Sequence, residues 1–296
     1  MRFFLAVLNT CMIDLAYAEV NWELNAYCKF QCSYCDSGFN SGALDKSVEQ
    51  YLSVIEKLQG TRYQHHSKIL WKLGGGEPLH FPHLATVLKK IKERDCIVRL
   101  DTSGDDTWFS YYAIANLVDQ VKLTYHSWQN DDVFGFILEQ CEEKNTAVSI
   151  VVPLEPGYIL QAKERVKHFR ELGYNCNEKF LHDRGGNVHR GYSRIDLNRI
   201  HGFPDDHEFE VAPPVYQDLS IVTDTSPIYT GSPCYAGVDW MYINPKGFAS
   251  YSQCGGRNEH FNVFDPEWTP PSQSFACTVN QCRSEQDRKK IRIIPV

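Results

Sequence analysis

Apolar residues in the first two-thirds of the chain follow two spacings, one typical of strands and one typical of helices. Runs that are largely apolar or alternate with polar residues predict strands. They fall at residues 20–27, 68–75, 96–103, 120–127, 147–153 and 178–183. The apolar beginning of the chain also favours a strand over an export signal, because only one basic residue precedes it.

Helical spacing fills the intervals between these runs. Apolar side chains recur every three or four positions over residues 48–58, 84–91, 134–141 and 166–172. Gly60 and Gly173 follow the first and last of these stretches and are predicted to end the helices.

This alternation of strand and helix predicts a parallel sheet with right-handed crossovers. Six such units are too few to close an eight-stranded barrel, so we expect an α/β fold that forms an open, curved partial barrel. In parallel α/β folds the chemistry lies at the carboxyl ends of the strands.

Unusual residues gather at these strand ends. The first strand leads into a cysteine triplet, and the second ends in the segment Gly74–Pro78. The third ends at 101–104 and the fourth at 125–127. We expect these segments to meet at one rim.

The later part of the chain has a different character. Residues 185–230 have weak periodicity and many turn formers, and predict a linker with a short hairpin or helix. Strand-like WMYIN and FASYS, joined by residues 245–247, predict a β-hairpin. We therefore expect two domains, 1–215 and 216–296.

Composition narrows the class of protein. The chain has 296 residues, 43% of them hydrophobic, which is enough for a substantial core. No apolar run reaches about 18 residues, so no membrane span is expected. The net charge of −7 does not favour binding to duplex nucleic acid. With 11 cysteines and no export signal, a cytoplasmic protein with metal-binding cysteines is expected.

Cys28, Cys32 and Cys35 form a C-x₃-C-x₂-C triplet. Three thiolates at this spacing can hold three irons of a [4Fe–4S] cluster and leave the fourth iron open to a substrate or cofactor. The alternative is zinc, but structural zinc takes four ligands and no fourth cysteine or histidine follows closely.

The triplet, Tyr34 before its last cysteine, the segment Gly75-Gly76-Glu77-Pro78 and the strand–helix alternation together resemble the radical S-adenosylmethionine (SAM) superfamily. The resemblance implies a partial (β/α)6 barrel. It also implies that a cluster electron cleaves SAM to a 5′-deoxyadenosyl radical, which abstracts hydrogen from an organic substrate.

The resemblance also implies a cofactor site. Gly75, Gly76 and Glu77 are expected to meet the methionine part of SAM. Other candidates for contact with SAM are Tyr34, Ser103, His126, Ser127 and, on adenine, Val152. The serines could instead cap the helices that follow them, and His126 could be an interior histidine.

Four later cysteines form a second group. The hairpin and a following helix resemble the twitch or SPASM auxiliary-cluster modules of this superfamily, although SPASM modules have more cysteines than the four present here. The resemblance implies one auxiliary [4Fe–4S] cluster, and a four-cysteine zinc site is the alternative. The proposed ligands are Cys234, Cys254, Cys277 and Cys282.

An auxiliary cluster could accept an electron, so we expect net oxidation of a small molecule or a modified residue, with an external flavodoxin- or ferredoxin-type donor. Candidates for the catalytic acid–base group are Tyr125, His126 and Asp183. The alternatives are a redox-neutral epimerase or isomerase, a peptide- or nucleotide-modifying enzyme, and a non-catalytic metal-binding or electron-transfer protein.

Overall fold

The computed structural model describes residues 17–30, 32, 34–35, 46–62, 64, 66–104, 108–182, 191–207, 230–251 and 261–278. Within these ranges nine strands form one sheet in the order β10-β9-β8-β1-β2-β3-β4-β5-β6. Its parallel half consists of β1 (Tyr17–Glu23), β2 (Lys68–Gly74), β3 (Cys96–Thr102), β4 (Gln120–Thr124), β5 (Ala147–Pro153) and β6 (Asn175–Lys179).

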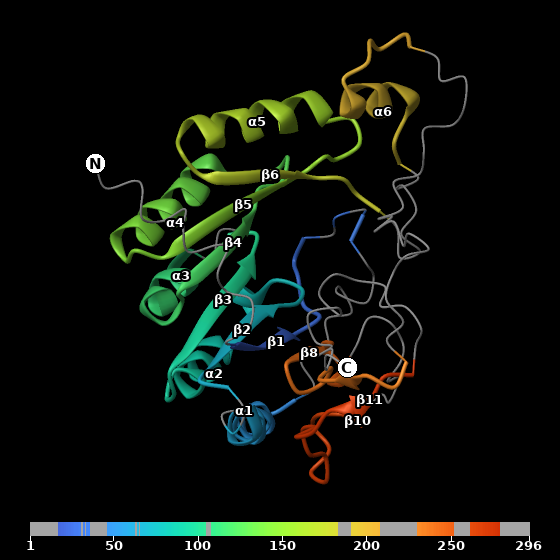
Figure 1. Cartoon of the computed structure of the whole chain (residues 1–296). Helices are drawn as coiled ribbons and strands as arrows, with labels where there is room; N and C mark the ends of the chain where they lie inside the picture. The colour runs from blue at the N-terminus through green and yellow to red at the C-terminus, as the bar shows by residue number, and fades with distance from the viewer. Residues whose placement is uncertain are drawn as a thin grey trace.

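The helices cover one face of this sheet, and the sheet curves so that its other face opens toward the C-terminal segment (Figure 1). This arrangement confirms the predicted α/β fold. Because β10 and β6 are the two edges of the sheet among the described residues, that sheet is open, as the six-unit pattern predicts. The helical layer consists of α1 (Val48–Arg62), α2 (Leu84–Ile91), α3 (Trp108–Ile114), α4 (Asp131–Glu143) and α5 (Ile159–Glu171).

Strand alternation separates the apolar core from a polar inner face. In β1, Ala18, Val20 and Trp22 are buried, and Trp22 stacks on Tyr51 of α1 with ring centroids 5.5 Å apart. The residues between them are Glu19, Asn21 and Glu23, and they line a cavity on the other face. A side chain in a strand points to the face opposite its neighbours, so the same strand supplies both core and cavity.

The sixth strand lies earlier than predicted, so the expected range 178–183 was wrong. β6 spans Asn175–Lys179 and pairs with β5 in parallel. Of its five residues only Cys176 is buried. An edge strand can be held by backbone hydrogen bonds to its one neighbour without an apolar run, so its sequence carries a weak signal.

The predicted end of the first helix at Gly60 was also wrong, because α1 continues to Arg62. A glycine inside a helix costs only about 1 kcal/mol. The last turn is held from both sides of Gly60. Gln59 Nε2 donates to the carbonyl of Ile91 at 2.9 Å, and the fully buried Arg62 donates to the carbonyl of Val238.

The C-terminal segment adds strands to the same sheet. β8 (Trp240–Ile243) lies parallel to β1, and β9 (Phe248–Ser250) pairs antiparallel with β8, which confirms the predicted hairpin. β10 (Phe261–Asn262) follows β9. A separate two-stranded sheet joins β7 (Pro233–Cys234) to β11 (Phe275–Ala276).

Within the predicted linker, α6 (Arg194–His201) begins with a capping box between Ser193 and Asp196. The expected domain boundary at 215–216 and the predicted strand within residues 1–16 lie outside the described residues. No helix in the described part of the chain has both the length and the apolar character required to cross a bilayer.

Candidate functional site

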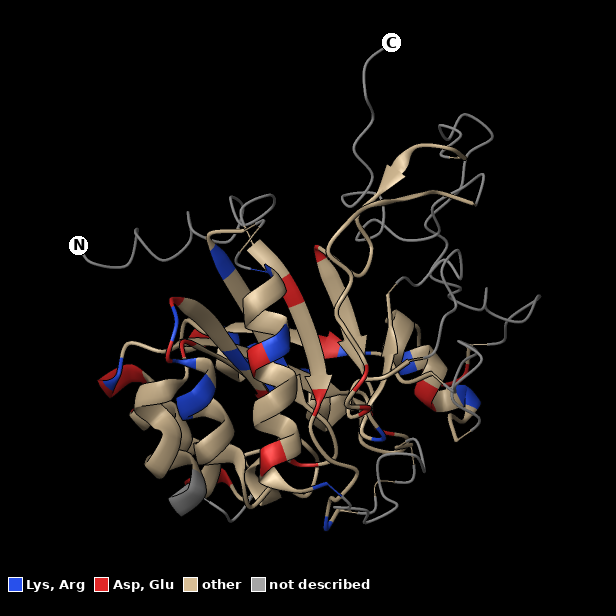
Figure 2. Ribbon diagram, turned by 90° about the horizontal axis from the view of Figure 1, so that it is seen from below, with Lys and Arg blue, Asp and Glu red and all other residues tan. Residues whose placement is uncertain are grey.

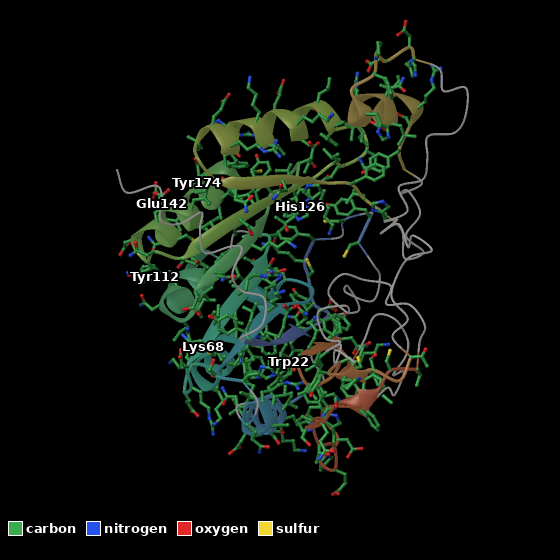
Figure 3. The ribbon with its side chains drawn as sticks, viewed as in Figure 1. Trp22, Lys68, Tyr112, His126, Glu142 and Tyr174 are labelled. Carbon is green, nitrogen blue, oxygen red and sulfur yellow. The ribbon has the colours of Figure 1, made fainter. Side chains whose placement is uncertain are left out.

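A cavity of about 810 Å³ opens at the carboxyl ends of the parallel strands. Four segments that the sequence predicted to meet line this cavity: the cysteine loop after β1, the glycine loop after β2, the end of β3 and the end of β4. His126 points into this region from the end of β4, whereas Tyr112 and Glu142 lie on helices outside the cavity and Tyr174 lies in the turn between α5 and β6 (Figure 3). The predicted site residues that line the cavity are Cys28, Cys32, Tyr34, Cys35, Gly75, Gly76, Glu77, Ser103 and His126.

The cysteine loop is fastened to the glycine loop by backbone hydrogen bonds. Leu24 N donates to Gly74 O at 2.8 Å, Gly76 N to Asn25 O at 2.9 Å and Glu77 N to Tyr27 O at 2.9 Å. Gly75 has a φ of +134°, and an added Cβ would lie 2.5 Å from Asn25 O. A glycine is therefore required here both for its backbone angle and for the close approach of the two loops.

The three thiols of the triplet share this cavity. Cys35 N donates to Cys32 O at 2.9 Å in the turn that joins the last two. Burial raises the pKa of Cys28 to about 11 and also raises the pKa values of Cys32 and Cys35. Without metal the site therefore holds protonated thiols near neutral pH, and binding iron must displace those protons.

The donor set fits a cluster with three cysteine ligands. Among the described residues, no three His, Cys, Asp or Glu side chains converge closely enough to hold a single metal ion. The irons of a cluster do not require such convergence, because each thiolate binds a different iron. The cavity beside the thiols leaves room for a further ligand on the fourth iron.

Glu77 joins the ends of two strands. Its side chain is 1% exposed and accepts hydrogen bonds from four donors on two segments. Thr102 Oγ1 lies 2.5 Å and Leu79 N 3.0 Å from Oε1, while Ser103 N and Ser103 Oγ lie 2.9 and 2.6 Å from Oε2. The Glu77 carboxylate and the Ser103 hydroxyl, both predicted to bind SAM, thus hold each other at the cavity wall.

Tyr34 and His126 meet at a buried carboxylate that the sequence did not single out. The Tyr34 hydroxyl lies 2.6 Å from His126 Nδ1 and 3.1 Å from Glu155 Oε1. Ser127 donates to Glu155 from its backbone N–H at 3.1 Å and its hydroxyl at 2.6 Å. Burial favours the neutral acid, but the hydrogen bonds from His126 and Ser127 outweigh it and lower the pKa of Glu155.

Three aromatic rings stack beside the cysteine loop. Trp128 lies between Phe30, at 3.9 Å between centroids, and His126, at 4.7 Å. The side chains of Trp128 and Tyr34 also hydrogen-bond to Cys32. This stack fixes the loop against the end of β4.

Three predicted residues lie away from the cysteine cavity. Tyr125, Ser127 and Val152 line a second hollow of about 510 Å³. The Tyr125 hydroxyl donates to Asp131 Oδ1 at 2.5 Å, and burial raises the pKa of Tyr125 to about 12. Asp183, the third candidate for acid–base catalysis, lies outside the described residues.

Two of the four later cysteines lie at a pair of strands, Cys234 within β7 and Cys277 directly after β11. Cys234 of β7 is in register with Phe275 of β11, and Cys277 N donates to Ser232 O at 2.9 Å. Both cysteines are 5% exposed and belong to one small buried cluster. Cys254 and Cys282 lie outside the described residues, as does most of the segment predicted to form the following helix.

The polar inner face of the sheet contributes residues that the sequence reasoning missed. Glu23, Lys122 and Lys179 line the cavity, and Glu155 supports it from the end of β5. Burial raises the pKa of Glu23 to about 7, against a smaller opposing effect of its hydrogen bond with Tyr242. Alternation along each strand could have indicated the first three, and the position of Glu155 two residues beyond β5 could have indicated the fourth.

Comparison with known proteins gives a likeness only in structure. A scan against protein-family models finds no match for the sequence, and a comparison with curated proteins finds none either. Among solved structures, anSMEcpe with bound AdoMet and the Cp18Cys peptide superposes with a TM-score of 0.51 at 12% identity, covering 93% of this chain and 82% of that one.

Two further structures are similar. The complex of anSMEcpe with AdoMet and the Kp18Cys peptide gives a TM-score of 0.51 at 12% identity over 84% of this chain and 78% of that chain. BtrN in complex with AdoMet and 2-DOIA gives a TM-score of 0.48 at 14% identity, covering 86% of this chain and 81% of that one. The two anSMEcpe structures show that this chain shares their α/β fold.

Proposed function

We propose that the chain is a radical SAM enzyme that abstracts hydrogen from an organic substrate. The observation that carries this proposal is the convergence of Cys28, Cys32 and Cys35 with the glycine loop on one cavity, in a fold shared with AdoMet-bound enzymes. When bound, the cluster and SAM supply the electron and the 5′-deoxyadenosyl radical that this chemistry requires.

The chain's own residues bind the cluster and form the walls of the cavity. The three thiolates hold three irons, and the backbone of Gly75 and Gly76 is open to the cavity beside them. Glu77 keeps the ends of β2 and β3 together through Thr102 and Ser103. Tyr34 and His126, held by Glu155, form the wall on the side of β4 and β5.

For the reaction, we propose oxidation that uses an auxiliary cluster held by Cys234, Cys277, Cys254 and Cys282. The pairing of β7 with β11, which places two of these cysteines in one buried cluster, supports this assignment. A peptidyl substrate is supported by the peptides bound in the similar anSMEcpe structures, and a small molecule is the alternative. An external one-electron donor completes the scheme.

The decisive experiment is anaerobic reconstitution followed by reduction in the presence of SAM. The wild-type protein should form 5′-deoxyadenosine and methionine, and Cys32→Ala should reduce both to background. Cys96→Ala is the matched control, because Cys96 lies at the opposite end of β3 with its Sγ 3.4 Å from Ile91 O. Failure of the reconstituted wild-type protein to cleave SAM would overturn the proposal.

A second measurement tests the auxiliary cluster. Iron and labile sulfide in Cys277→Ala should fall to the amount of one cluster per chain, while Cys176→Ala should retain that of two. Cys176 is a suitable control because it is equally buried but belongs to β6. Zinc bound in place of the second cluster would refute this part of the scheme.

A further inference from the structure

The cavity floor carries charged side chains in a defined pattern. Asp101 of β3 is in register with Lys122 of β4, and Glu23 of β1 with Gly74 of β2. An added Cβ on Gly74 would lie 3.7 Å from the Asp101 Cβ, so these four residues form one row across neighbouring strands. Charges of both signs lie along the strands in the view from below (Figure 2).

Two of the cations in the cavity have dedicated carboxylates. Lys72 Nζ lies 2.7 Å from Glu19 Oε1. Arg99 donates to Asp101 through Nε at 2.8 Å and Nη2 at 3.1 Å, so it occupies both carboxylate oxygens. In these two pairs the charges on the cavity-facing side of β1, β2 and β3 balance each other.

The remaining two cations lack such a partner. Lys122 Nζ lies 3.8 Å from Asp101 Oδ2, which already accepts from Arg99. The side chain of Lys179, at the end of β6, makes no hydrogen bond or ion pair with any residue in the described part of the chain, and it is exposed to the cavity that it lines. The cavity walls partly desolvate its ammonium group, and this desolvation and the repulsion by Lys122 outweigh the attraction of Asp101 and lower the pKa of Lys179.

Two lysines that line one cavity without a carboxylate of their own bind an anion more readily than two isolated surface lysines, because one anion can be attracted by both charges within the same enclosed volume. We propose that Lys122 and Lys179 bind a carboxylate or phosphate group of the molecule that reacts in this cavity. The proposal rests on the proposed function and adds the chemical class of the substrate, an anion.

The same chemistry has a second source, because the methionine part of SAM carries a carboxylate. We assign the lysines to the other substrate from their position. Lys122 carries this assignment, because it is two residues before the end of β4, inside the sheet, whereas the glycine loop and the cysteines lie beyond the strand ends. Lys179 is the last residue of β6 and interacts electrostatically with Cys35, so it lies between Lys122 and the cysteine loop.

The test uses inorganic phosphate as the probe with reconstituted protein, followed by calorimetric titration at constant ionic strength. Phosphate should bind the wild-type protein saturably, and the double variant K122Q/K179Q should bind it at least tenfold more weakly. Lys89→Gln, on the exposed face of α2, is the charge-matched control and should bind as the wild type does. Equal phosphate binding by wild type and double variant would overturn the proposal.

Saturating SAM separates the two sources of the anion. If the lysines hold the second substrate, the phosphate affinity stays within about twofold when SAM is present. Displacement of phosphate by SAM assigns the lysines to the SAM carboxylate and overturns the substrate assignment. A parallel acetate titration shows whether carboxylate or phosphate is preferred.

The phosphate test can still be interpreted if a variant folds poorly or if the proposed function is wrong. Removing one of two repelling lysines should leave the protein at least as stable as the wild type, so a poorly folded K179Q would also count against the proposal. Phosphate binding without any formation of 5′-deoxyadenosine by the wild type would leave the anion site intact and refute the proposed function instead.

Discussion

At the scale of single residues, Glu77 shows how one carboxylate can organise the site. It is buried and accepts hydrogen bonds from Leu79, Thr102 and Ser103, so it binds the segments after β2 and β3 to each other. Buried acceptors with several donors are costly to change, because each donor left without a partner retains its desolvation cost.

The variant Glu77→Gln replaces one acceptor oxygen with an amide that donates. We expect the free energy of unfolding to fall by about 2–4 kcal/mol, measured by urea denaturation. Glu139→Gln, an exposed substitution on α4, is the control and should leave the urea midpoint unchanged. A Glu77→Gln protein as stable as the control would show that the four hydrogen bonds do not hold the strand ends.

Gly75 tests the close approach of the two loops. Gly75→Ala places a Cβ 2.5 Å from Asn25 O and imposes a side chain at φ +134°, so the cysteine loop must shift. We expect reduced stability and loss of deoxyadenosine formation. In contrast, Gly60→Ala meets nothing within 4 Å in α1 and should raise the free energy of unfolding by about 0.4–1 kcal/mol. Full activity in Gly75→Ala would contradict this account.

Glu23 makes a pH-dependent contribution whose sign follows from burial. Its pKa is about 7 in the folded protein and near 4.5 when unfolded, so between these values the folded state holds the extra proton. Stability from this residue is therefore present at pH 4.5 and is lost as the pH rises to 7. One oxygen of its carboxylate, Oε2, is buried with no hydrogen bond to a described residue.

We expect Glu23→Gln to flatten this decline. Comparing urea denaturation at pH 5 and pH 7.5, the variant should lose about 1–2 kcal/mol less than the wild type, a value reduced for partial solvent screening. Glu56→Gln on the exposed side of α1 should retain the wild-type decline. An identical pH dependence in wild type and Glu23→Gln would rule out this role.

At the scale of elements, sequence reasoning succeeded where a strong periodicity coincided with burial. The range 84–91 matches α2, and 147–153 matches β5, because both elements pack an apolar face against neighbours. It failed at β6 and at the end of α1, where backbone pairing and the buried contacts of Arg62 decide the boundary. These long-range contacts leave no local pattern.

Site residues likewise fall into those that the sequence predicted and those that it did not. Cys28 and Gly75 could be found because strand-end position and motif both mark them, and His126 because it follows the end of a strand. Alternation and strand-end position could have indicated where Lys179 and Glu155 lie, but not what they do, since their roles arise from residues more than fifty positions away: Tyr34 meets Glu155, and Lys122 repels Lys179. Val152 was chosen as the end of a strand, but its side chain faces the second hollow.

One contact between elements far apart in sequence can be tested directly. Lys57 of α1 donates to the carbonyls of Pro266 at 2.7 Å and Trp268 at 2.9 Å. Lys57→Met should lower the free energy of unfolding by about 1–2 kcal/mol and speed hydrogen exchange near Trp268. Lys89→Met on α2 should change neither. Unaltered exchange near Trp268 in Lys57→Met would show that the lysine does not hold this turn.

At the scale of the whole molecule, the C-terminal segment completes the sheet that carries the site. β8 pairs with β1 on the side away from β2, and Met241 and Ile243 of β8 are fully buried in the main core. β1 leads into the cysteine loop, so the strand that positions the triplet has a C-terminal neighbour. Stability and site geometry are therefore coupled through one strand pair.

This coupling predicts how a shortened chain behaves. A fragment of residues 1–215 lacks β8, and it exposes both the backbone edge of β1 and the apolar surface that Met241 and Ile243 cover. An exposed edge beside apolar side chains favours association with other chains. We expect this fragment to aggregate, measured by gel filtration and light scattering.

Full-length protein cleaved at a protease site inserted after residue 215 should stay assembled, because strand pairing rather than chain continuity holds the halves together. A monomeric 1–215 fragment with one cooperative unfolding transition would instead mean that the parallel half folds on its own and that β8 is an addition to it.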